Sequence, residues 1–213
     1  MEFIFFVFIG IALMVLLGAL LFNRDARIKR SIKRVPRVKI KDFSDGTIGR
    51  VVGQVRLIDE TSAPMSGRPC AQYHLVIEQR RSSGRSSHWV TLVDEQRMVD
   101  FVVEDGSGRA VVNTIGAKVA VVKDAKARSG TFNSATPELE ALLARHGHDS
   151  TGFLGFNKTI RYQEGVIEEG EMVAVCGLGR IERQAGSHRG QLVIGPTAEG
   201  PVLVSDHPST CKP

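Results

Sequence analysis

The sequence predicts a mainly β protein in which one N-terminal transmembrane helix is followed by a β-barrel-like, OB-like domain with a single inserted α-helix. Residues 3–22 form an unbroken apolar run. From residue 42 onward, apolar and polar residues alternate with the period of a β-strand. Residues 136–147 carry the pattern of a helix. We therefore divide the chain into an anchor (1–23), a basic juxtamembrane segment (24–41), a β-rich domain (42–204) and a tail (205–213).

The apolar run has the length of a membrane span. At about 1.5 Å of rise per residue, about 20 residues cross the ~30 Å hydrocarbon layer. A cleaved signal peptide would place positive charge before the run, but here the charge follows it. A buried core helix of this length normally keeps a polar face. The pattern favours an integral anchor with one span.

Charge is distributed unevenly and predicts the orientation. Residues 1–41 hold nine basic and two acidic residues, and all nine follow the apolar run. Basic residues flanking a span stay on the cytoplasmic side, so we expect the N-terminus outside and the C-terminal domain in the cytoplasm. The remaining sequence has 19 basic and 21 acidic residues, a net charge of −2. A nearly neutral domain argues against nucleic acid as a partner.

The basic segment itself can form a short amphipathic helix that ends near Pro36. Ile28 and Ile32 are four residues apart, so they share one face of such a helix. The cations can serve as a stop-transfer collar, or they can contact anionic lipid headgroups at about 1 kcal/mol per basic residue. Both interpretations can hold together. The predicted headgroup contacts are Arg24, Arg27, Lys29, Arg30, Lys33 and Arg34.

Alternating segments separated by turn residues predict the strands of the domain. They are residues 48–58, 72–79, 88–94, 99–104, 109–113, 118–123, 158–163, 171–182, 190–195 and 201–204. Thr136 is the expected N-cap of the inserted helix, Pro137 its first residue and Gly147 its end. Residues 101–112 and 166–177 resemble hairpins of OB-type barrels. The tail after residue 204 is expected to be frayed.

Several patterns suggest chemistry but are better explained structurally. His146, His148 and Asp149 lack a further ligand at fixed spacing, so a solvated helix end is preferred to a metal site. Cys70 and Cys176 are expected in the core, and three scattered cysteines predict no disulfide framework. The glycines at 106–108 and 177–179 are interpreted as strand turns, because neither opens a phosphate-binding helix. We therefore predict no catalytic, cofactor-binding or metal-binding residue and no cofactor.

Two surface candidates remain. Phe153, Leu154 and Phe156 lie among glycines after the helix, where they can plug the core or contact a membrane or partner. Arg80, Arg81 and Arg85, with Trp89, are the one cluster that suits a nucleic acid.

Three segments carry a family resemblance: residues 63–73 (APMSGRPCAQY), residues 101–112 and residues 161–170 (RYQEGVIEEG). In them the chain resembles the GIDE (or BAM) domain, the membrane-flanking domain of a mitochondrial ubiquitin ligase and of many bacterial membrane proteins. The ligase in that family carries a RING finger, which needs about eight Cys and His ligands. After Gly177 this sequence offers Cys211, His188 and His207.

The sequence therefore favours a non-catalytic, membrane-anchored module that binds a protein or lipid partner at the cytoplasmic membrane face. Ubiquitin-ligase-related activity is the alternative that the resemblance implies. A nucleic-acid-binding OB-like barrel is the third possibility.

Overall fold

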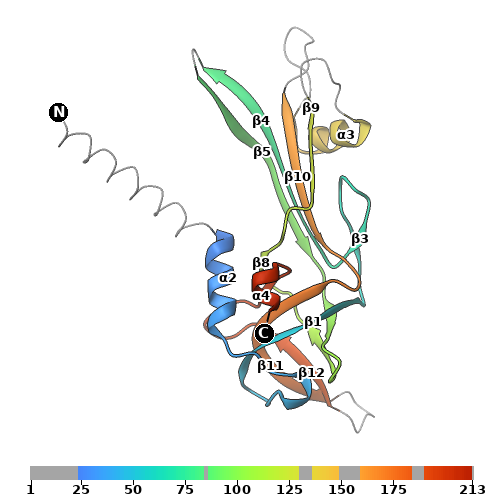
Figure 1. The fold of residues 1–213 in the computed structure, drawn as a ribbon. Helices are drawn as coiled ribbons and strands as arrows, with labels where there is room; N and C mark the ends of the chain where they lie inside the picture. Colours follow the sequence, from blue (N-terminus) through green and yellow to red (C-terminus); the bar gives the residue numbers. More distant parts are fainter. Residues whose placement is uncertain (1–23, 84–85, 130–135, 149–158, 184–189, 213) are drawn as a thin grey trace, which may run out of the picture. The chain divides into compact units, whose positions relative to one another are not determined.

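The computed structural model describes residues 24–83, 86–129, 136–148, 159–183 and 190–212 (Figure 1). In chain order the elements are α2 (Arg24–Arg34), the short 3-10 turn η1 (Ile40–Asp42), β1 (Ile48–Leu57), β2 (Thr61–Ser62), β3 (Pro69–Cys70), β4 (Gln72–Ser83), β5 (Ser86–Met98), β6 (Phe101–Glu104), β7 (Arg109–Val112), β8 (Lys118–Ala120), β9 (Ala125–Ser129), α3 (Pro137–Arg145), β10 (Ile160–Ile167), β11 (Met172–Arg183), β12 (Gly190–Gly195), β13 (Leu203–Ser205) and α4 (Pro208–Cys211). The predicted mainly β class is confirmed.

The largest sheet has the strand order β1-β6-β7-β12-β11-β13-β8, and β1 also pairs with β11. This additional pairing closes β1, β6, β7, β12 and β11 into a five-stranded barrel. The barrel is mixed, because β7 and β12 run parallel with Val111 opposite Val193, whereas β1–β6 and β11–β12 are antiparallel. The predicted barrel is thus confirmed.

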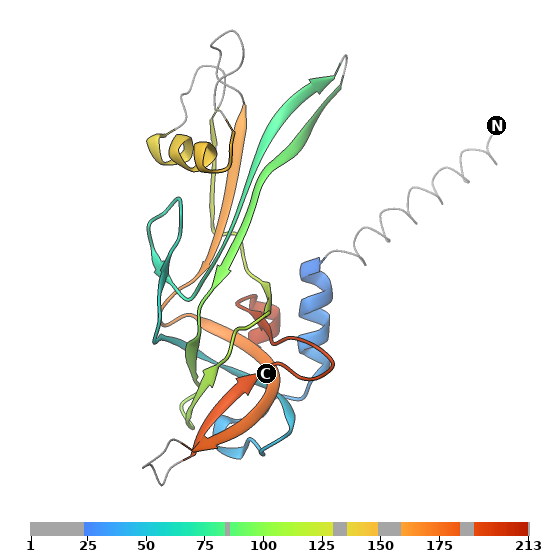
Figure 2. The same cartoon turned by 180° about the vertical axis from the view of Figure 1, so that it is seen from behind.

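A second sheet is antiparallel, with the order β5-β4-β10-β9 (Figure 2). Helix α3 packs Leu139, Leu142 and Leu143 against Leu75 and Ile77 of β4. The Thr136 side chain accepts a hydrogen bond from the Leu139 N–H, which is an N-cap contact. The helix predicted from residue 136 is therefore present where its capping pattern placed it.

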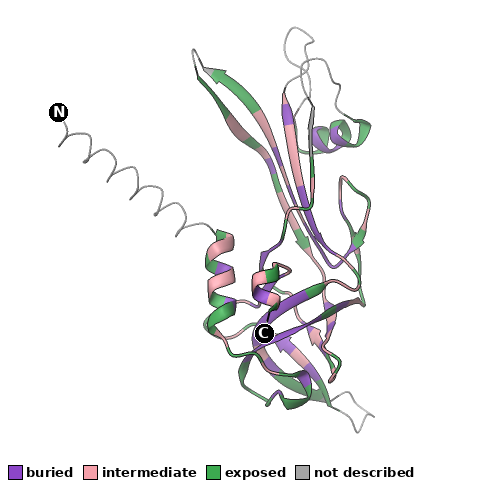
Figure 3. Ribbon diagram, viewed as in Figure 1, coloured by how far each residue is buried: buried purple, intermediate pink, exposed green. Residues whose placement is uncertain are grey.

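The chain divides into two compact units, each with its own core. The first consists of Met1–Gly53, Asp105–Ala120 and Met172–Pro213, and the second of Gln54–Glu104 and Val121–Glu171. In the first unit, buried side chains of α2 contact Val52, Ala120 and Ala174. In the second unit, the α3 leucines and β4 form the main cluster. Figure 3 shows these buried positions along the strands and on one side of α3.

Both ends of the described chain differ from the expected boundaries. Helix α2 belongs to the first unit, because its two isoleucines are buried there, so this unit includes the basic segment that was expected to precede the β-rich domain. The frayed tail was a wrong prediction: β13 pairs with β11, and α4 buries Thr210 completely.

The internal elements also show corrections. Strands β4 and β5 form a longer hairpin than predicted, from Gln72 opposite Met98 to Ser83 opposite Ser86. The glycines at 177–179 lie inside β11 and not in a turn. A Cβ on Gly179 would overlap the Phe43 ring, so close packing against Phe43 explains that glycine. The glycines at 106–108 do form the β6–β7 turn, as predicted.

No helix in the described residues is long and apolar enough to span a bilayer. The predicted span at residues 3–22 lies outside those residues.

Candidate functional site

Helix α2 carries all six predicted headgroup residues and is fixed to the first unit by its apolar stripe. Ile32 is fully buried and Ile28 is 5 % exposed. Both belong to the cluster that includes Ala174 and Cys176 of β11. Burial of two large aliphatic side chains stabilises this attachment by roughly 3–6 kcal/mol. The apolar side of α2 therefore packs on protein, and its polar sides are left for other contacts.

The six cations of α2 do not form one cluster. Arg24, Arg27, Lys33 and Arg34 are exposed, whereas Lys29 and Arg30 are half-buried. Arg30 donates a hydrogen bond from Nε to the carbonyl oxygen of Ala26 at 3.1 Å. The cations thus lie on both flanks of the buried stripe.

One flank affects His207, the residue that caps α4. The His207 Nδ1 accepts a hydrogen bond from the Ser209 N–H at 3.1 Å. Desolvation lowers the pKa of His207, and the positive charges of Lys29 and Lys33 lower it further. A cation next to an imidazole disfavours its protonated form. The positive potential of Lys29 and Lys33 on this flank therefore extends to His207.

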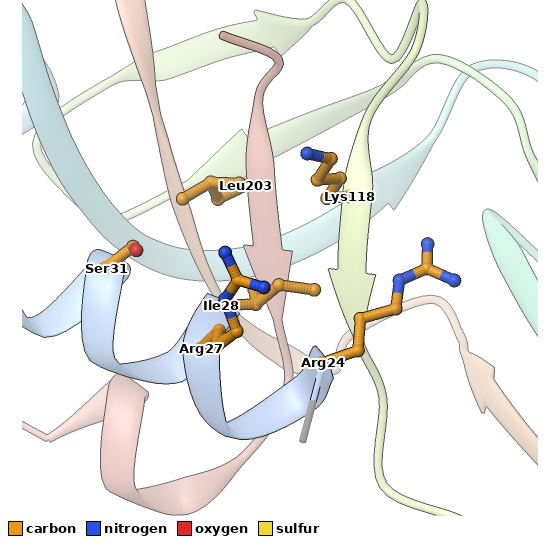
Figure 4. A pocket seen from close by; sticks show the side chains of 6 residues that line it. All are labelled: Arg24, Arg27, Ile28, Ser31, Lys118 and Leu203. Carbon is orange, nitrogen blue, oxygen red and sulfur yellow. The ribbon is translucent and has the colours of Figure 1, made fainter. Parts of the chain in front are cut away.

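The other flank lines a cavity of about 350 Å³ (Figure 4). Arg24, Arg27 and Ser31 line it from α2, Lys118 from β8 and Leu203 from β13. Ile28 contributes apolar surface. We call this space the α2 pocket. Sequence reasoning found its two arginines but missed Lys118 and Leu203, because only the folded sheet brings these distant residues to the helix.

Two of the three family-like segments meet at a buried carboxylate. Glu164 in β10 is fully buried and accepts hydrogen bonds from the backbone N–H groups of Met65 at 2.9 Å and Ser66 at 3.1 Å. The N–H of Gly67 closes the same loop onto the Ala63 carbonyl at 2.9 Å. Gly67 has φ +69°, a conformation that glycine adopts without steric cost. The most specific part of the resemblance is therefore a loop held in place by Glu164.

Arg68 and Cys70 follow this loop and are engaged with neighbours. Arg68 forms ion pairs with Asp124 at 2.9 Å and Glu168 at 3.1 Å. Cys70 is buried, and its thiol donates to the Thr61 carbonyl oxygen at 3.4 Å. Burial raises the pKa of Cys70 to about 11, so the thiolate required of a nucleophile is scarce at neutral pH. The predicted core role of Cys70 is confirmed.

Cys176 is also buried, and burial raises its pKa to about 11. Its predicted core position is confirmed.

The two histidines near the end of α3 bind different partners on β5. His146 Nε2 lies 2.9 Å from a Glu95 carboxylate oxygen, and His148 Nε2 lies 3.1 Å from the Leu92 carbonyl oxygen. Tyr73 also donates its hydroxyl to Glu95. Hydrogen bonds from Tyr73 and then His146 lower the pKa of Glu95 against the opposing effect of burial. In the described part of the chain no three His, Cys, Asp or Glu residues gather as a metal site, and Asp149 lies outside that part.

In the predicted cluster of arginines with Trp89, both Arg80 and Trp89 contact other residues of the second unit. Arg80 donates to the Ser87 hydroxyl at 2.8 Å. The Arg161 guanidinium lies 4.1 Å from the centroid of the Trp89 ring and forms an ion pair with Glu78 at 2.7 Å. One face of the indole is thus already covered by a cation, which reduces its use as a stacking surface. Arg81 is exposed.

Four predicted surface residues lie outside the described part of the chain. They are Arg85, Phe153, Leu154 and Phe156.

A comparison with protein families identifies the family of this chain. The GIDE family model, described as an E3 ubiquitin ligase, matches residues 72–210, which is more than half of the 213-residue chain. No curated protein and no solved structure shows a significant match.

Proposed function

The chain belongs to the GIDE family, and from this premise we propose that it is a membrane-anchored, non-catalytic module that binds a protein or lipid partner at the cytoplasmic membrane face. Residues 3–22 are the proposed span, with the N-terminus outside. The exposed cations of α2 are the proposed contacts with anionic headgroups.

The attachment of α2 is the observation that carries this proposal. The helix begins at Arg24, two residues after the apolar run ends at Phe22. Its buried isoleucines join it to the folded unit, so the tether between bilayer and domain is very short. Cations near an anionic membrane surface each contribute about 1 kcal/mol. A rigid basic helix at this place supports a module that works against the membrane surface.

The strand order supports a finer assignment of the barrel. A closed ring of β1, β6, β7, β12 and β11 with one parallel pair fits the five-stranded OB class. Such barrels often bind nucleic acid, but fold alone does not assign function. The nearly neutral sequence after residue 41 and the covered Trp89 ring favour a different partner.

The family description favours a second candidate, ubiquitin-ligase-related activity. In RING ligases that activity depends on zinc held by about eight Cys and His ligands. The residues after Gly177 in this sequence offer Cys211, His188 and His207, of which Cys211 donates its thiol to the Met172 carbonyl at 3.4 Å. Because a RING needs more ligands than these three and Cys211 is already hydrogen-bonded, we keep the binding module as the leading candidate.

Photo-crosslinking of the full chain in its membrane tests the proposal. A photoreactive phenylalanine analogue replaces Lys33 or Arg34, both exposed on α2, and in a matched control it replaces Glu182, exposed on β11. We expect phospholipid or protein adducts at the α2 positions in clear excess over the control. Equal adduct yields at all three positions contradict a contact by α2.

The orientation is measured in the same cells. Lys126→Cys places a thiol at an exposed position of β9; Cys70 and Cys176 are buried, and the half-buried Cys211 is replaced by serine in the same chain. We expect a membrane-impermeant maleimide to label the introduced cysteine only after the cells are opened. Labelling in intact cells contradicts the cytoplasmic placement.

A further inference from the structure

The α2 pocket combines positive charge with an apolar wall. Arg24, Arg27 and Lys118 bring three cations to its lining, and Ser31 adds a hydroxyl. Ile28 and Leu203 supply aliphatic surface. Figure 4 shows Arg27 extending from α2 on the side where Lys118 of β8 and Leu203 of β13 lie, with Ser31 to one side of it and Arg24, which extends away from Arg27, to the other. Such a lining suits an anionic group that is attached to a hydrocarbon part.

Among the described residues, no acidic side chain pairs with the three cations of this pocket. No ion pair within the described residues involves Arg24, Arg27 or Lys118. By contrast, Arg68 and Arg161 in the second unit each pair with a carboxylate. Three cations without an ion-pair partner among the described residues raise the local concentration of anions around the cavity. The pocket is therefore electrostatically prepared for a ligand with more than one negative charge.

The chemistry of the donors selects a phosphate group. A phosphate monoester carries about −1.5 to −2 charges at pH 7 and has three acceptor oxygens. Guanidinium groups bind phosphate oxygens in pairs, and a lysine adds a point charge. A cavity of about 350 Å³ lies at the small end of the range for ligand sites, about 300–1,000 Å³. A phosphate diester, with one charge and two free oxygens, would leave part of this donor set unused.

The pocket lies directly after the apolar run in the sequence, which favours a lipid as the molecule that carries the phosphate. Arg24 and Arg27 follow Phe22 by two and five residues. Even a fully extended chain places them at most about 7 Å and 18 Å from the end of the apolar run. The headgroup layer on each side of a bilayer is roughly 5–8 Å thick. With residues 3–22 in the bilayer, Arg24 therefore lies at the headgroup layer, and Arg27, one helical turn further on, lies at its edge.

We propose that the α2 pocket binds the phosphate-monoester headgroup of a phospholipid, with Arg27 and Lys118 as the phosphate ligands, Arg24 and Ser31 at the two sides of the site, and Ile28 and Leu203 against the glycerol and first acyl carbons. This inference rests on the proposed function, because it requires that α2 lie at a membrane. It goes beyond a diffuse attraction of basic residues to an anionic surface, since it assigns a specific site and includes a lysine that is distant from α2 in the sequence.

Calorimetric titration of the full chain in an uncharged detergent tests the site. The probe is dioctanoyl phosphatidic acid, a monoester, and the comparison lipid is dioctanoyl phosphatidylglycerol, a diester. We expect the monoester to bind about tenfold more tightly than the diester, because the extra charge makes further charge-assisted hydrogen bonds. Equal affinity for the two lipids overturns the proposed selectivity.

Two pocket variants and one control distinguish binding at a specific site from nonspecific attraction of the lipid to positive charge. Lys118→Gln and Arg27→Gln should each weaken binding of phosphatidic acid about tenfold or more. Lys41→Gln removes the same charge at an exposed position outside the pocket and should change binding less than about twofold. Equal losses in all three variants overturn the pocket but leave the α2 crosslinks of the proposed function unaffected. Thermal melting of each variant shows that the fold is retained, and Arg27, exposed on the helix, remains informative where Lys118→Gln fails to fold.

Inorganic phosphate distinguishes the lipid from a soluble ligand. We expect inorganic phosphate to compete with phosphatidic acid only weakly, because it lacks the hydrocarbon part that Ile28 and Leu203 would contact. Equal affinity for inorganic phosphate and for the lipid, with the same loss in Lys118→Gln, would assign the site to a soluble phosphate and overturn the lipid.

Discussion

At the scale of single residues, Glu164 links parts of the sequence that lie about one hundred positions apart. Its carboxylate is buried, yet it receives two backbone N–H groups from residues 65 and 66. Without these donors, a buried carboxylate would lose its hydration with no replacement. The loop likewise depends on Glu164, because two of its N–H groups have their bonds there. This mutual dependence joins the two family-like segments in the folded chain.

We expect Glu164→Gln to lower the free energy of unfolding by about 1–3 kcal/mol. The amide has nearly the same volume, but its NH₂ group would face a backbone donor in place of an accepting oxygen. Urea unfolding of the chain in uncharged detergent measures the change. Glu60→Gln, the same substitution at an exposed position, should stay within about 0.5 kcal/mol. Equal effects in the two variants would mean that Glu164 does not hold the loop.

At the scale of elements, strands with strong alternation of apolar and polar residues were predicted correctly. Strands that form mainly by pairing with a neighbouring strand were not predicted. The pairs 101–104 and 109–112 are present as β6 and β7 because one face of each is apolar and buried. By contrast, β9 (AKARS) has no aliphatic side chain larger than alanine and is a strand because β10 pairs with it. The distal part of the β4–β5 hairpin contains mostly Arg, Ser and His, and its backbone ladder extends it together with the contact of Arg80 with the Ser87 hydroxyl.

The β6–β7 turn is joined to η1 by one carboxylate. Asp105 accepts hydrogen bonds from the N–H of Ile40 at 2.9 Å, from the N–H and hydroxyl of Ser107 at 2.8 and 2.7 Å, and from the N–H of Gly108 at 3.2 Å. Burial acts to raise the pKa of Asp105, but these hydrogen bonds together lower it below the ordinary value of 3.8. A folded-state pKa below the unfolded-state value means that the unfolded chain binds the proton more readily.

Acid should therefore weaken this connection. The contribution of Asp105 to stability is complete above its unfolded-state pKa and is lost as the pH falls through the lower, folded-state pKa. We expect Asp105→Asn to lower the free energy of unfolding at pH 7 and to make the curve between pH 6 and pH 2 flatter than in the original chain. Denaturation across this range measures the difference between the two curves. Parallel curves would show that Asp105 does not titrate differently in the folded state.

At the scale of the whole molecule, each unit is assembled from separate stretches of chain, and this limits what the sequence can predict. The charge pattern after the apolar run identified the cations of α2, including both arginines of the pocket. It did not identify Lys118 or Leu203, because their place beside α2 follows from the pairing of β8 with β13. Similarly, Ile28 and Ile32 were correctly assigned to one helix face, but their spacing does not say whether that face meets lipid or protein.

The assembly of the first unit predicts where the chain can be shortened. A fragment of residues 24–213 retains α2 and should unfold cooperatively, whereas residues 42–213 lack the two isoleucines that cover Val52, Ala120 and Ala174. Losing one such buried side chain costs about 2–5 kcal/mol, and a domain has only about 5–15 kcal/mol in total. We therefore expect the shorter fragment to lose its melting transition or to aggregate.

Point variants in the longer fragment separate lost packing from lost charge. Ile32→Ala should reduce the free energy of unfolding by about 2–5 kcal/mol, because Ile32 is fully buried. Arg27→Ala on the exposed side of the same helix should change it by no more than about 0.5 kcal/mol. Equal stability of the two fragments, together with a neutral Ile32→Ala, would show that α2 is an appendage and not part of the folded unit. The expected result would instead mean that the segment nearest the predicted membrane span is structural, so that any force or ligand acting on α2 acts directly on the core of the first unit.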